Sequence, residues 1–366
     1  MGTYAHLYYL GLTAVGFDAL WGVMVRNGTA QAIGQAKTTG VLPCGEALRR
    51  SYIGLAVVDR FLLSPVIFYD GMTHHRHPAQ RALLVALFST MQTTSFTMFV
   101  NGIRHSRHPL WPALKSMFWG MFNQSHGAAF VYPVYFFTHL KQFTQLRHDQ
   151  ELEHIDEADA EALVCTSVIA AILPLWLIVP TIVPCSTDTR QVLIASYRLT
   201  PAILSMMQPL LARLLRVTRR KNQPGTQVSR SRVKRLVKLS LVISGAAAAM
   251  GHLYGIASGC LASGSRLVDV FWPGATDVRP GARDIITQGC HLFLQNDWWV
   301  IVAAVVPVVS AMISNGKRDG TVSLGLGHQG LQRLFGGLKD RWVTLTGLTI
   351  MFSPGAALAW SLAETV

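Results

Sequence analysis

Apolar runs long enough to cross a lipid bilayer as helices dominate this sequence. A spanning helix needs about 20 mainly apolar residues, and nine runs meet this requirement, at 3–25, 52–72, 82–101, 117–139, 162–183, 192–213, 237–260, 289–313 and 343–363. The second run is the least regular, because Pro65 interrupts it and charged residues flank it. The pattern predicts an all-α fold, a polytopic transmembrane helical bundle of about 8–9 spans.

The charge content agrees with this fold class. Only 14% of the 366 residues are charged, whereas soluble domains carry roughly 25%. No long polar segment separates the runs, so we predict a single transmembrane domain over residues 1–366. Much of the net charge of +13 lies in the loop 216–238 between two runs. Cytoplasmic loops of membrane proteins are commonly rich in Lys and Arg, and such loops bind anionic lipid head groups. We therefore expect membrane lipids but no nucleic acid as partners.

The same basic loop predicts the orientation of the chain. A cytoplasmic loop 216–238 puts the N-terminus in the cytoplasm, and nine spans would leave the C-terminus on the opposite side. We expect a multi-pass protein of the endoplasmic reticulum. Cys260 and Cys290 flank one predicted lumenal loop. A disulfide between them and two free thiols are both compatible with that placement.

Aspartates inside or beside the apolar runs are the main candidates for function. A charged side chain at the bilayer centre costs roughly 2.5–3.5 kcal/mol even on lenient insertion scales, so such groups face the bundle interior and mark functional sites. An ion pair or a position at the membrane interface is the alternative for each. The candidate catalytic residues are Asp18, Asp59, Asp70, Asp269 and Asp297.

The surroundings of these acids suit carbocation chemistry. A carboxylic acid shielded from water stays protonated more readily, and it is then a competent general acid toward an alkene or an epoxide. Aromatic faces stabilise a cation by up to about 2 kcal/mol when desolvated. Uncharged polar groups in "NQSHG" could orient a substrate. The candidate substrate-binding residues are the aromatic Tyr132, Phe293, Trp298 and Trp299 and the polar Asn123, Gln124 and His126.

Two other classes of protein remain open. Intramembrane aspartates in Pro- and Gly-interrupted spans also serve proton-coupled transporters. The histidine clusters "HHRH" at 74–77 and "HSRH" at 105–108 suggest a membrane oxidase or desaturase. That reading is disfavoured because no HxxHH pattern occurs and the predicted topology puts the clusters on opposite sides of the membrane.

Motifs for metal-dependent prenyl diphosphate chemistry are absent from the sequence. It contains no DDxxD, no NDxxDxxxD and no DxDD, and Asn296-Asp297 lacks the later aspartates of the second pattern. We therefore predict no metal site and no cofactor.

Three segments together resemble a known family. "EALRRSYIGLAVVDRFLLSPVIFYDGM", "FVNGIRHSRH" with "WGMFNQSHGAAFVYPVYFFTHL", and "FLQNDWWVI" are similar to the integral-membrane terpene cyclases of fungal meroterpenoid biosynthesis, such as the macrophorin and ascofuranone pathway cyclases. The resemblance spans most of the chain. The family pattern falls on Arg49, Ser51, Tyr52, Gly54, Asp59, Asp70, Gly71, Arg104 and Asp297.

The resemblance implies a function in secondary metabolism. Such an enzyme cyclises a prenyl chain, usually farnesyl, on a phenol or quinone, by protonating a terminal alkene or epoxide without a metal. The resemblance does not say which aspartate donates the proton. We expect Asp59 or Asp297 to do so, and Tyr52 to be among the substrate-binding residues. The expected partners are a lipophilic prenylated phenol or its epoxide and pathway enzymes such as a prenyltransferase and an epoxidase.

Overall fold

The computed structural model is a bundle of helices. It describes residues 3–74, 77–106, 108, 110–144, 152, 154–222, 229–262, 265–274, 284–318, 347 and 349–366. Over these residues the one β-bridge joins Val41 and Ala47, outside any strand. The helices are α1 Thr3–Phe17, the π-helical turn η1 Asp18–Gly22, α2 Val23–Arg26, α3 Thr29–Thr39, α4 Ala56–His74, α5 Pro78–Arg104, α6 Trp111–His126, α7 Ala128–Thr144, α8 Glu157–Ile172, α9 Leu175–Ile182, α10 Thr187–Tyr197, α11 Thr200–Asn222, α12 Arg230–Leu261, α13 Leu267–Phe271, α14 Ile285–Arg318 and α17 Pro354–Ala363.

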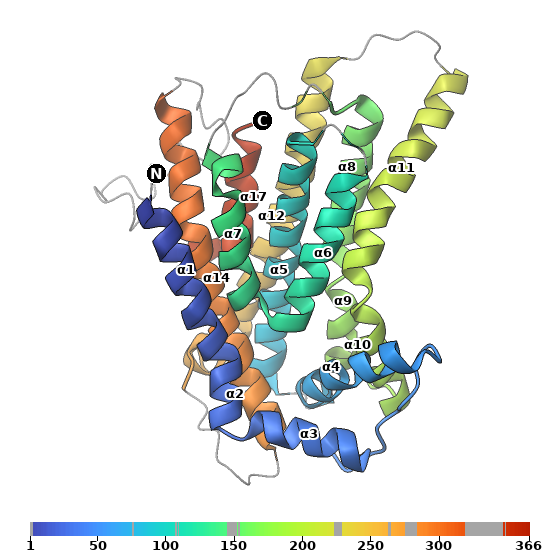
Figure 1. Cartoon of the computed structure of the whole chain (residues 1–366), viewed down its shortest axis with the longest axis vertical. Coiled ribbons are helices and arrows are strands. Elements are labelled where there is room, and N and C mark those ends of the chain that lie inside the picture. The colour runs from blue at the N-terminus through green and yellow to red at the C-terminus, as the bar shows by residue number, and fades with distance from the viewer. Residues whose placement is uncertain are drawn as a thin grey trace.

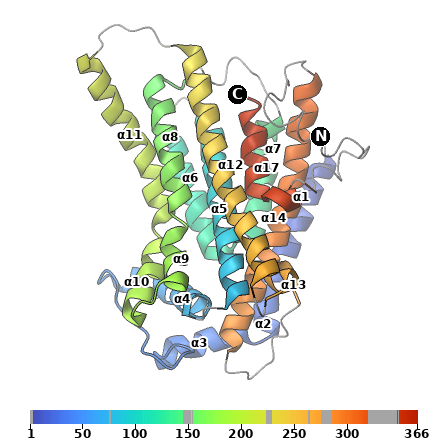
Figure 2. The same ribbon diagram turned by 180° about the vertical axis from the view of Figure 1, so that it is seen from behind.

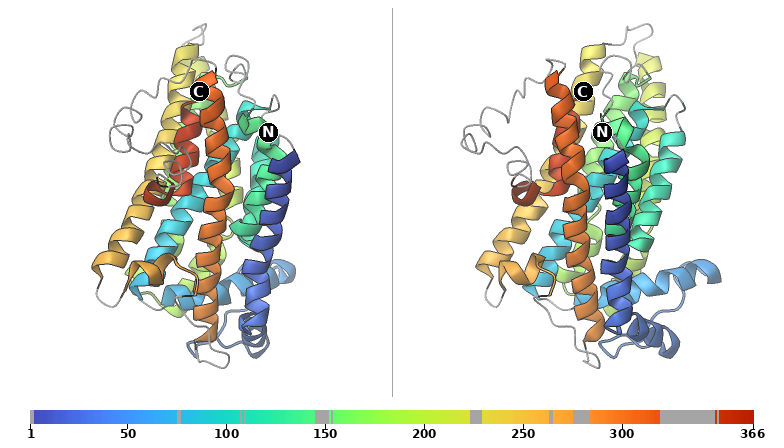
Figure 3. Two further views of the ribbon diagram at one scale, coloured as in Figure 1. Left: turned by 90° about the vertical axis from the view of Figure 1, so that its left-hand side faces the viewer. Right: turned by 60° about the vertical axis from the view of Figure 1, so that its left-hand side comes forward.

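Most of the long helices run roughly side by side, and α3 and α4 lie across their lower end (Figures 1 and 3). Both termini lie at the upper end of the bundle (Figure 1). This arrangement differs from the one expected for nine full crossings, which would separate the termini. One of the runs predicted to cross, 52–72, corresponds largely to α4, which lies across the bundle instead.

Five helical segments are long and apolar enough to cross a membrane, judged by length and composition over the described residues. They are Tyr4–Arg26, Pro78–Arg104, Glu157–Ile182, Arg230–Leu261 and Ile285–Ile313. The all-α prediction is confirmed, whereas the count of 8–9 spans is not. Part of the predicted last run, 343–346 and 348, lies outside the described residues.

Small residues allow the central helices to approach closely. Figure 2 shows α8, α11 and α12 side by side in front of α5, and α12 packs against both α5 and α8. On α12, Gly251 lies against Ser89 of α5, and Gly255 lies against Ala86 and Ala82 of the same helix. Contact between small residues is the usual way in which helices pack tightly where no hydrophobic effect draws them together.

Cysteine pairing is absent from the structure. All five cysteines of the chain are free thiols, with Cys290 buried in the bundle and Cys260 exposed. Of the two possibilities that the sequence left open for this pair, the structure has the free thiols.

A backbone reversal at Gly127 divides the predicted run 117–139 into two helices. α6 and α7 contact each other and form a hairpin, whose tip stops above α4 inside the bundle (Figure 1). Gly127 ends α6 with a φ of 89°, a left-handed value that an L side chain rarely adopts. A Cβ at this position would also meet Leu20 and Phe293. The reversal therefore requires glycine here.

Gly127→Ala should destabilise the protein and lower any activity that depends on the hairpin tip. Backbone strain of this kind costs about 1–3 kcal/mol, and the added methyl group would displace neighbouring side chains. Thermal unfolding in detergent measures the effect. Gly11→Ala is the matched control, because nothing lies near a Cβ at Gly11; equal melting temperatures for the two variants would contradict the requirement for glycine.

Candidate active site

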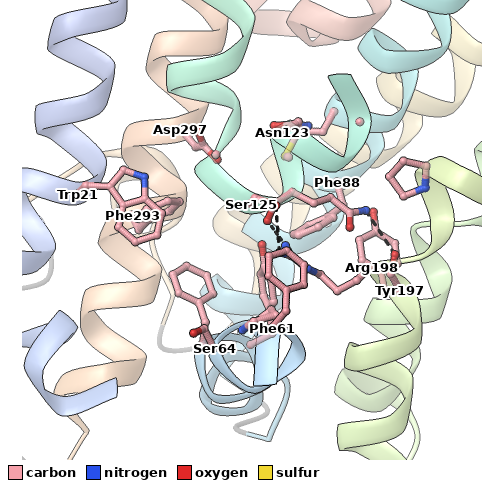
Figure 4. Close-up of a pocket in the computed structure, with 18 of the residues that line it drawn as sticks. Trp21, Phe61, Ser64, Phe88, Asn123, Ser125, Tyr197, Arg198, Phe293 and Asp297 are labelled. Atoms are coloured by element: carbon pink, nitrogen blue, oxygen red, sulfur yellow. Dashed lines mark hydrogen bonds between the residues drawn. The ribbon is translucent and has the colours of Figure 1, made fainter. Parts of the chain in front are cut away.

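A cavity of about 450 Å³ lies beneath the tip of the α6–α7 hairpin. This volume falls within the range of about 300–1,000 Å³ that is usual for small-molecule sites. Figure 4 shows side chains from helices far apart in sequence pointing into it. The aromatic and charged residues that line it are Trp21, Lys37, Arg60, Phe61, Phe68, Tyr69, Phe88, Tyr197, Arg198, Phe293 and Asp297.

Six aromatic rings form a continuous row along this cavity. Each ring meets the next edge-on: the centroid distances are 5.7 Å from Trp21 to Phe293, 5.1 Å to Phe68, 4.7 Å to Tyr69, 5.6 Å to Phe88 and 5.4 Å to Tyr197. Edge-to-face contacts of this kind are favourable between aromatic rings. They leave ring surface available to a ligand, and the face of an aromatic ring attracts cations. The row can therefore shelter a positive charge along its length.

Asp297 lies one helical turn from Phe293 and shares its side of α14, which places the carboxyl group at one end of the row. Its side chain is buried, with only 1% of the residue exposed. The backbone N–H of Ala129, in the first turn of α7, donates to Asp297 Oδ1 at 2.5 Å. This is the only carboxyl group among the described residues that line the cavity. Of the five aspartates predicted as catalytic, Asp297 alone faces this space.

The two tryptophans that follow Asp297 point elsewhere. Trp298 stacks on His252 at 4.8 Å, and the Trp299 indole N–H donates to the carbonyl of Phe271 at 2.7 Å. Successive helical residues are about 100° apart, so three in a row cannot share one side of a helix. The structure thus brings Phe293 and Asp297 together but not Trp298 and Trp299.

Arg198 lies at the other end of the row, next to Tyr197. It is 5% exposed and donates to the carbonyl of Gln124 at the end of α6. Figure 4 shows it across the cavity from Asp297. The hairpin tip therefore contacts both groups. The N–H groups at the start of a helix suit a carboxyl oxygen, and the carbonyl groups at the end of a helix suit a cation. Asp297 meets the start of α7, and Arg198 meets the end of α6.

Three side chains of "NQSHG" line the cavity, and two of them, Asn123 and Gln124, are among the predicted binding residues. Gln124 Nε2 donates to Thr200 Oγ1 at 3.1 Å, which fixes the hairpin tip to the start of α11. The amide oxygens of Asn123 and Gln124 are buried without a hydrogen-bond partner among the described residues. Unsatisfied buried acceptors are rare in folded proteins, so these oxygens are available to a bound ligand.

Three other predicted binding residues do not line the cavity. Tyr132 and His126 lie in the hairpin itself, and Tyr52 lies in the turn before α4. The Tyr132 hydroxyl donates to the Met91 carbonyl at 3.0 Å, behind the cavity wall. The His126 ring packs on Phe122 at 4.6 Å, while its carbonyl accepts from the Trp21 indole at 3.0 Å. Tyr52 lies outside the cavity, with its ring 5.9 Å from the Arg49 guanidinium.

Asp59 holds the turn that precedes α4. Its carboxylate accepts from the backbone N–H groups of Tyr52, Ile53 and Gly54 at 2.9–3.1 Å and from the hydroxyl of Ser51 at 3.1 Å. These donors, led by the Ile53 and Tyr52 N–H groups, hold the pKa of Asp59 below its ordinary value. A carboxylate stabilised in this way favours its ionised form.

Three other aspartates form ion pairs. Asp18 pairs with Arg26 at 2.6 Å on an exposed surface. Asp269 pairs with Arg266 at 3.0 Å, which lowers the pKa of Asp269. Asp70 is buried and accepts from Arg190 at 2.7 Å. The ion-pair alternative that the sequence left open thus holds for these three residues.

The histidine clusters lie at opposite ends of α5. His77 precedes it and His105 follows it, and 27 helical residues span about 40 Å. His75 lies outside the described residues. Among the described residues, no three His, Cys, Asp or Glu side chains gather where they could hold a metal ion.

Sequence reasoning missed Trp21, Phe68, Tyr69, Phe88 and Arg198 in this cavity. For Arg198 the signal was present, because a lone arginine interrupts the apolar run 192–213 and the rule that marked the aspartates applies equally to cations. The four aromatic residues carried no comparable signal, since rings in apolar helices most often serve ordinary packing.

Fold and cavity together define an all-α protein with apolar helices and an internal cavity lined largely by apolar side chains. The chain belongs to the CtvD domain family, whose model matches residues 5–364. No solved structure matches the chain.

Curated relatives come from three fungi. The chain is 30% identical to "Terpene cyclase alnG" of Emericella nidulans over 316 residues, 82% of each chain. It is 25% identical to "Terpene cyclase DEP1" of Fusarium langsethiae, over 97% of this chain and 96% of the relative. A DEP1 of Alternaria brassicicola is also 25% identical, over 96% and 95%. The resemblance to fungal terpene cyclases is therefore confirmed, and these relatives support a terpene cyclase role.

Asp70→Ala should destabilise the protein strongly, because it leaves Arg190 buried without its partner. Breaking a buried ion pair from one side costs about 3–5 kcal/mol, whereas exposed pairs contribute little. Thermal unfolding should show a large drop for Asp70→Ala and almost none for Asp18→Ala. Similar drops for both variants would contradict a structural role specific to the Asp70–Arg190 pair.

Asp59→Ala should weaken the fold in a pH-dependent way. Because folding lowers the pKa of Asp59, its contribution is present above the unfolded value of about 3.9 and is lost as the pH falls below that through the folded value. Melting temperatures of the wild type and the variant should differ most at pH 7 and approach each other as the pH falls below about 4. A difference that persists unchanged at pH 3 would mean that the carboxylate does not hold this turn.

Proposed function

We propose that this chain is a membrane-bound, metal-independent terpene cyclase that closes rings in a prenyl chain, farnesyl in length, carried by a phenol or quinone. The observation that carries the proposal is the buried Asp297 carboxyl group at one end of a row of aromatic rings in a cavity of about 450 Å³. The terpene cyclases among its relatives support the reaction class.

Asp297 supplies the proton that starts the cyclisation. The proton adds to the terminal alkene carbon or to the oxygen of a terminal epoxide, whose C–O bond then breaks, and a tertiary carbocation forms. The Ala129 N–H stabilises the carboxylate that remains, as preorganised donors do for developing negative charge. Internal alkenes attack the cation in turn. The last cation loses a proton to a base such as Gln124 Oε1, and reprotonation of the Asp297 carboxylate closes the cycle. The reaction is an isomerisation, so atoms and charge balance.

The aromatic row guides the chain and shelters the cation. Phe68 lies between Phe293 and Tyr69, so a cation that migrates away from Asp297 stays close to ring faces. Closure of the site against water matters, because water would trap the cation as an alcohol. The orphan amide oxygens of Asn123 and Gln124 would accept hydrogen bonds from hydroxyl groups on the aromatic head.

The cellular setting follows from the chemistry and the charge distribution. A farnesylated phenol partitions into lipid, so its cyclase belongs in a membrane, here the endoplasmic reticulum, beside a prenyltransferase and, for an epoxide substrate, an epoxidase. The ends of α11 and α12 that border the basic loop lie at the same end as the N-terminus (Figure 1). The positive-inside rule then places that end, with both termini, in the cytoplasm.

Microsomes from yeast that express the chain test the reaction. They would receive a farnesylated phenol and, separately, its terminal epoxide, and mass spectrometry would look for a product of unchanged mass and shifted retention. Asp297→Asn should reduce product at least about 100-fold, the scale of general acid catalysis. Asp18→Asn is the control, because Asp18 lies on the surface. No isomer from either substrate, in membranes that contain the protein, would refute the proposed function.

Phe68→Leu should lower turnover about 10-fold and raise the share of alcohol by-products. The change keeps an apolar side chain but removes a ring face, whose interaction with a desolvated cation reaches about 2 kcal/mol. Phe118→Leu is the matched control, since Phe118 is exposed on the outside of α6. An unchanged product profile for Phe68→Leu would show that this ring does not face the cation.

A further inference from the structure

Two buried arginines at one end of the bundle differ in their partners. Arg190 on α10 is neutralised by Asp70 at 2.7 Å. Arg198, at the end of the same helix, has no carboxylate within ion-pair distance among the described residues, and its Nε–H has no hydrogen-bond partner there. A buried charge without a counter-ion is costly. The Gln124 carbonyl, a contact of 3.5 Å to Ser125 Oγ and the Phe61 ring 5.0 Å away offset part of this cost, but none of them carries a negative charge.

The position of Arg198 suits recognition of a ligand. It lines the cavity and follows Tyr197, the last ring of the aromatic row, while Asp297 lies at the opposite end (Figure 4). A molecule bound along the row would therefore place one end at an acid and the other at a cation. Its apolar chain would contact the rings between them.

A second basic space adjoins this end of the cavity. It has a volume of about 490 Å³ and is lined by Lys37, Arg50 and Arg60, of which Lys37 and Arg60 also line the main cavity. The one acid in its lining is Asp59, whose carboxylate is taken up by the turn at residues 51–54. A mouth with an excess of positive charge raises the local concentration of anions.

We propose that Arg198 binds a carboxylate on the aromatic head of the substrate, so that the preferred substrate class is a prenylated aromatic acid rather than a neutral phenol. This inference rests on the proposed function for the identity of the prenyl chain. The carboxylate supplies the counter-ion that Arg198 lacks, and a guanidinium group matches a carboxylate in a paired, two-bond geometry. The basic mouth draws the anion in, and the chain then extends along the rings to Asp297.

Binding without turnover tests the inference directly. Two ligands would be compared on the purified protein in detergent: a dihydroxybenzoic acid with a fully hydrogenated farnesyl chain, which cannot be cyclised, and its methyl ester. The acid should bind the wild type about 10- to 100-fold more tightly than the ester, the usual strength of a hydrogen-bonded charge pair. Equal affinities for acid and ester would overturn the proposal, and this comparison needs no variant.

Variants assign the preference to Arg198. Arg198→Gln should abolish the preference for the acid while leaving the affinity for the ester nearly unchanged, and Arg198→Lys should restore part of it. Arg26→Gln is the control for loss of one positive charge, because Arg26 is an exposed residue outside the cavity. If Arg198→Gln lowered the affinity for the acid and for the ester equally, Arg198 would serve only to hold the hairpin tip, and the proposal would fail.

Turnover and lipid competition separate the remaining outcomes. Asp297→Asn should keep the preference for the acid in binding while losing cyclisation of the unsaturated acid. Preferential binding without cyclisation by the wild type would refute the proposed function but not the carboxylate site. Cyclisation of acid and ester with equal kcat/KM would refute the carboxylate site but not the proposed function. Phosphatidylserine in the micelles should not displace the acid; displacement would assign Arg198 to a lipid head group and overturn the proposal.

Discussion

The reversal of the chain at Gly127 is the constraint on which the rest of the site depends. It stops the α6–α7 hairpin inside the bundle, and the cavity lies beneath the tip. It also brings two helix ends to one place. The first N–H groups of α7 and the last carbonyl groups of α6 have no partner within their own helix, so they can bond to other side chains. Each end attracts the opposite charge, so the tip holds Asp297 on one side and Arg198 on the other.

The polar groups of the chain serve two different purposes. Where an acid and a base meet directly, as in Asp70 with Arg190, they join α4 to α10 and need no ligand. Asp59 likewise needs no ligand, because its carboxylate accepts from the backbone N–H groups of Tyr52 and Ile53 in the turn before α4. Asp297 and Arg198 have no such side-chain partner of opposite charge among the described residues, and both face one cavity. A chain that tolerates the cost of two buried ionisable groups without paired side chains in one space offers them to something that it binds.

Between the two charges the cavity is aromatic rather than aliphatic. Aliphatic side chains would bury a prenyl chain equally well through the hydrophobic effect, but only ring faces attract a cation. The row from Trp21 to Tyr197 draws its members from η1, α4, α5, α14 and the end of α10.

The sequence by itself determined the fold class, the wealth of apolar helices and the family, because hydropathy, low charge and local motifs are properties of the linear chain. It also marked Asp297 and Phe293, since the helical repeat puts residues four apart on one face. Only the tertiary structure decided which aspartates have partners, that 117–139 turns back at Gly127, and that Arg198 faces Asp297. Those outcomes depend on contacts between segments up to hundreds of residues apart, and helical periodicity says which residues share a face but not what that face meets.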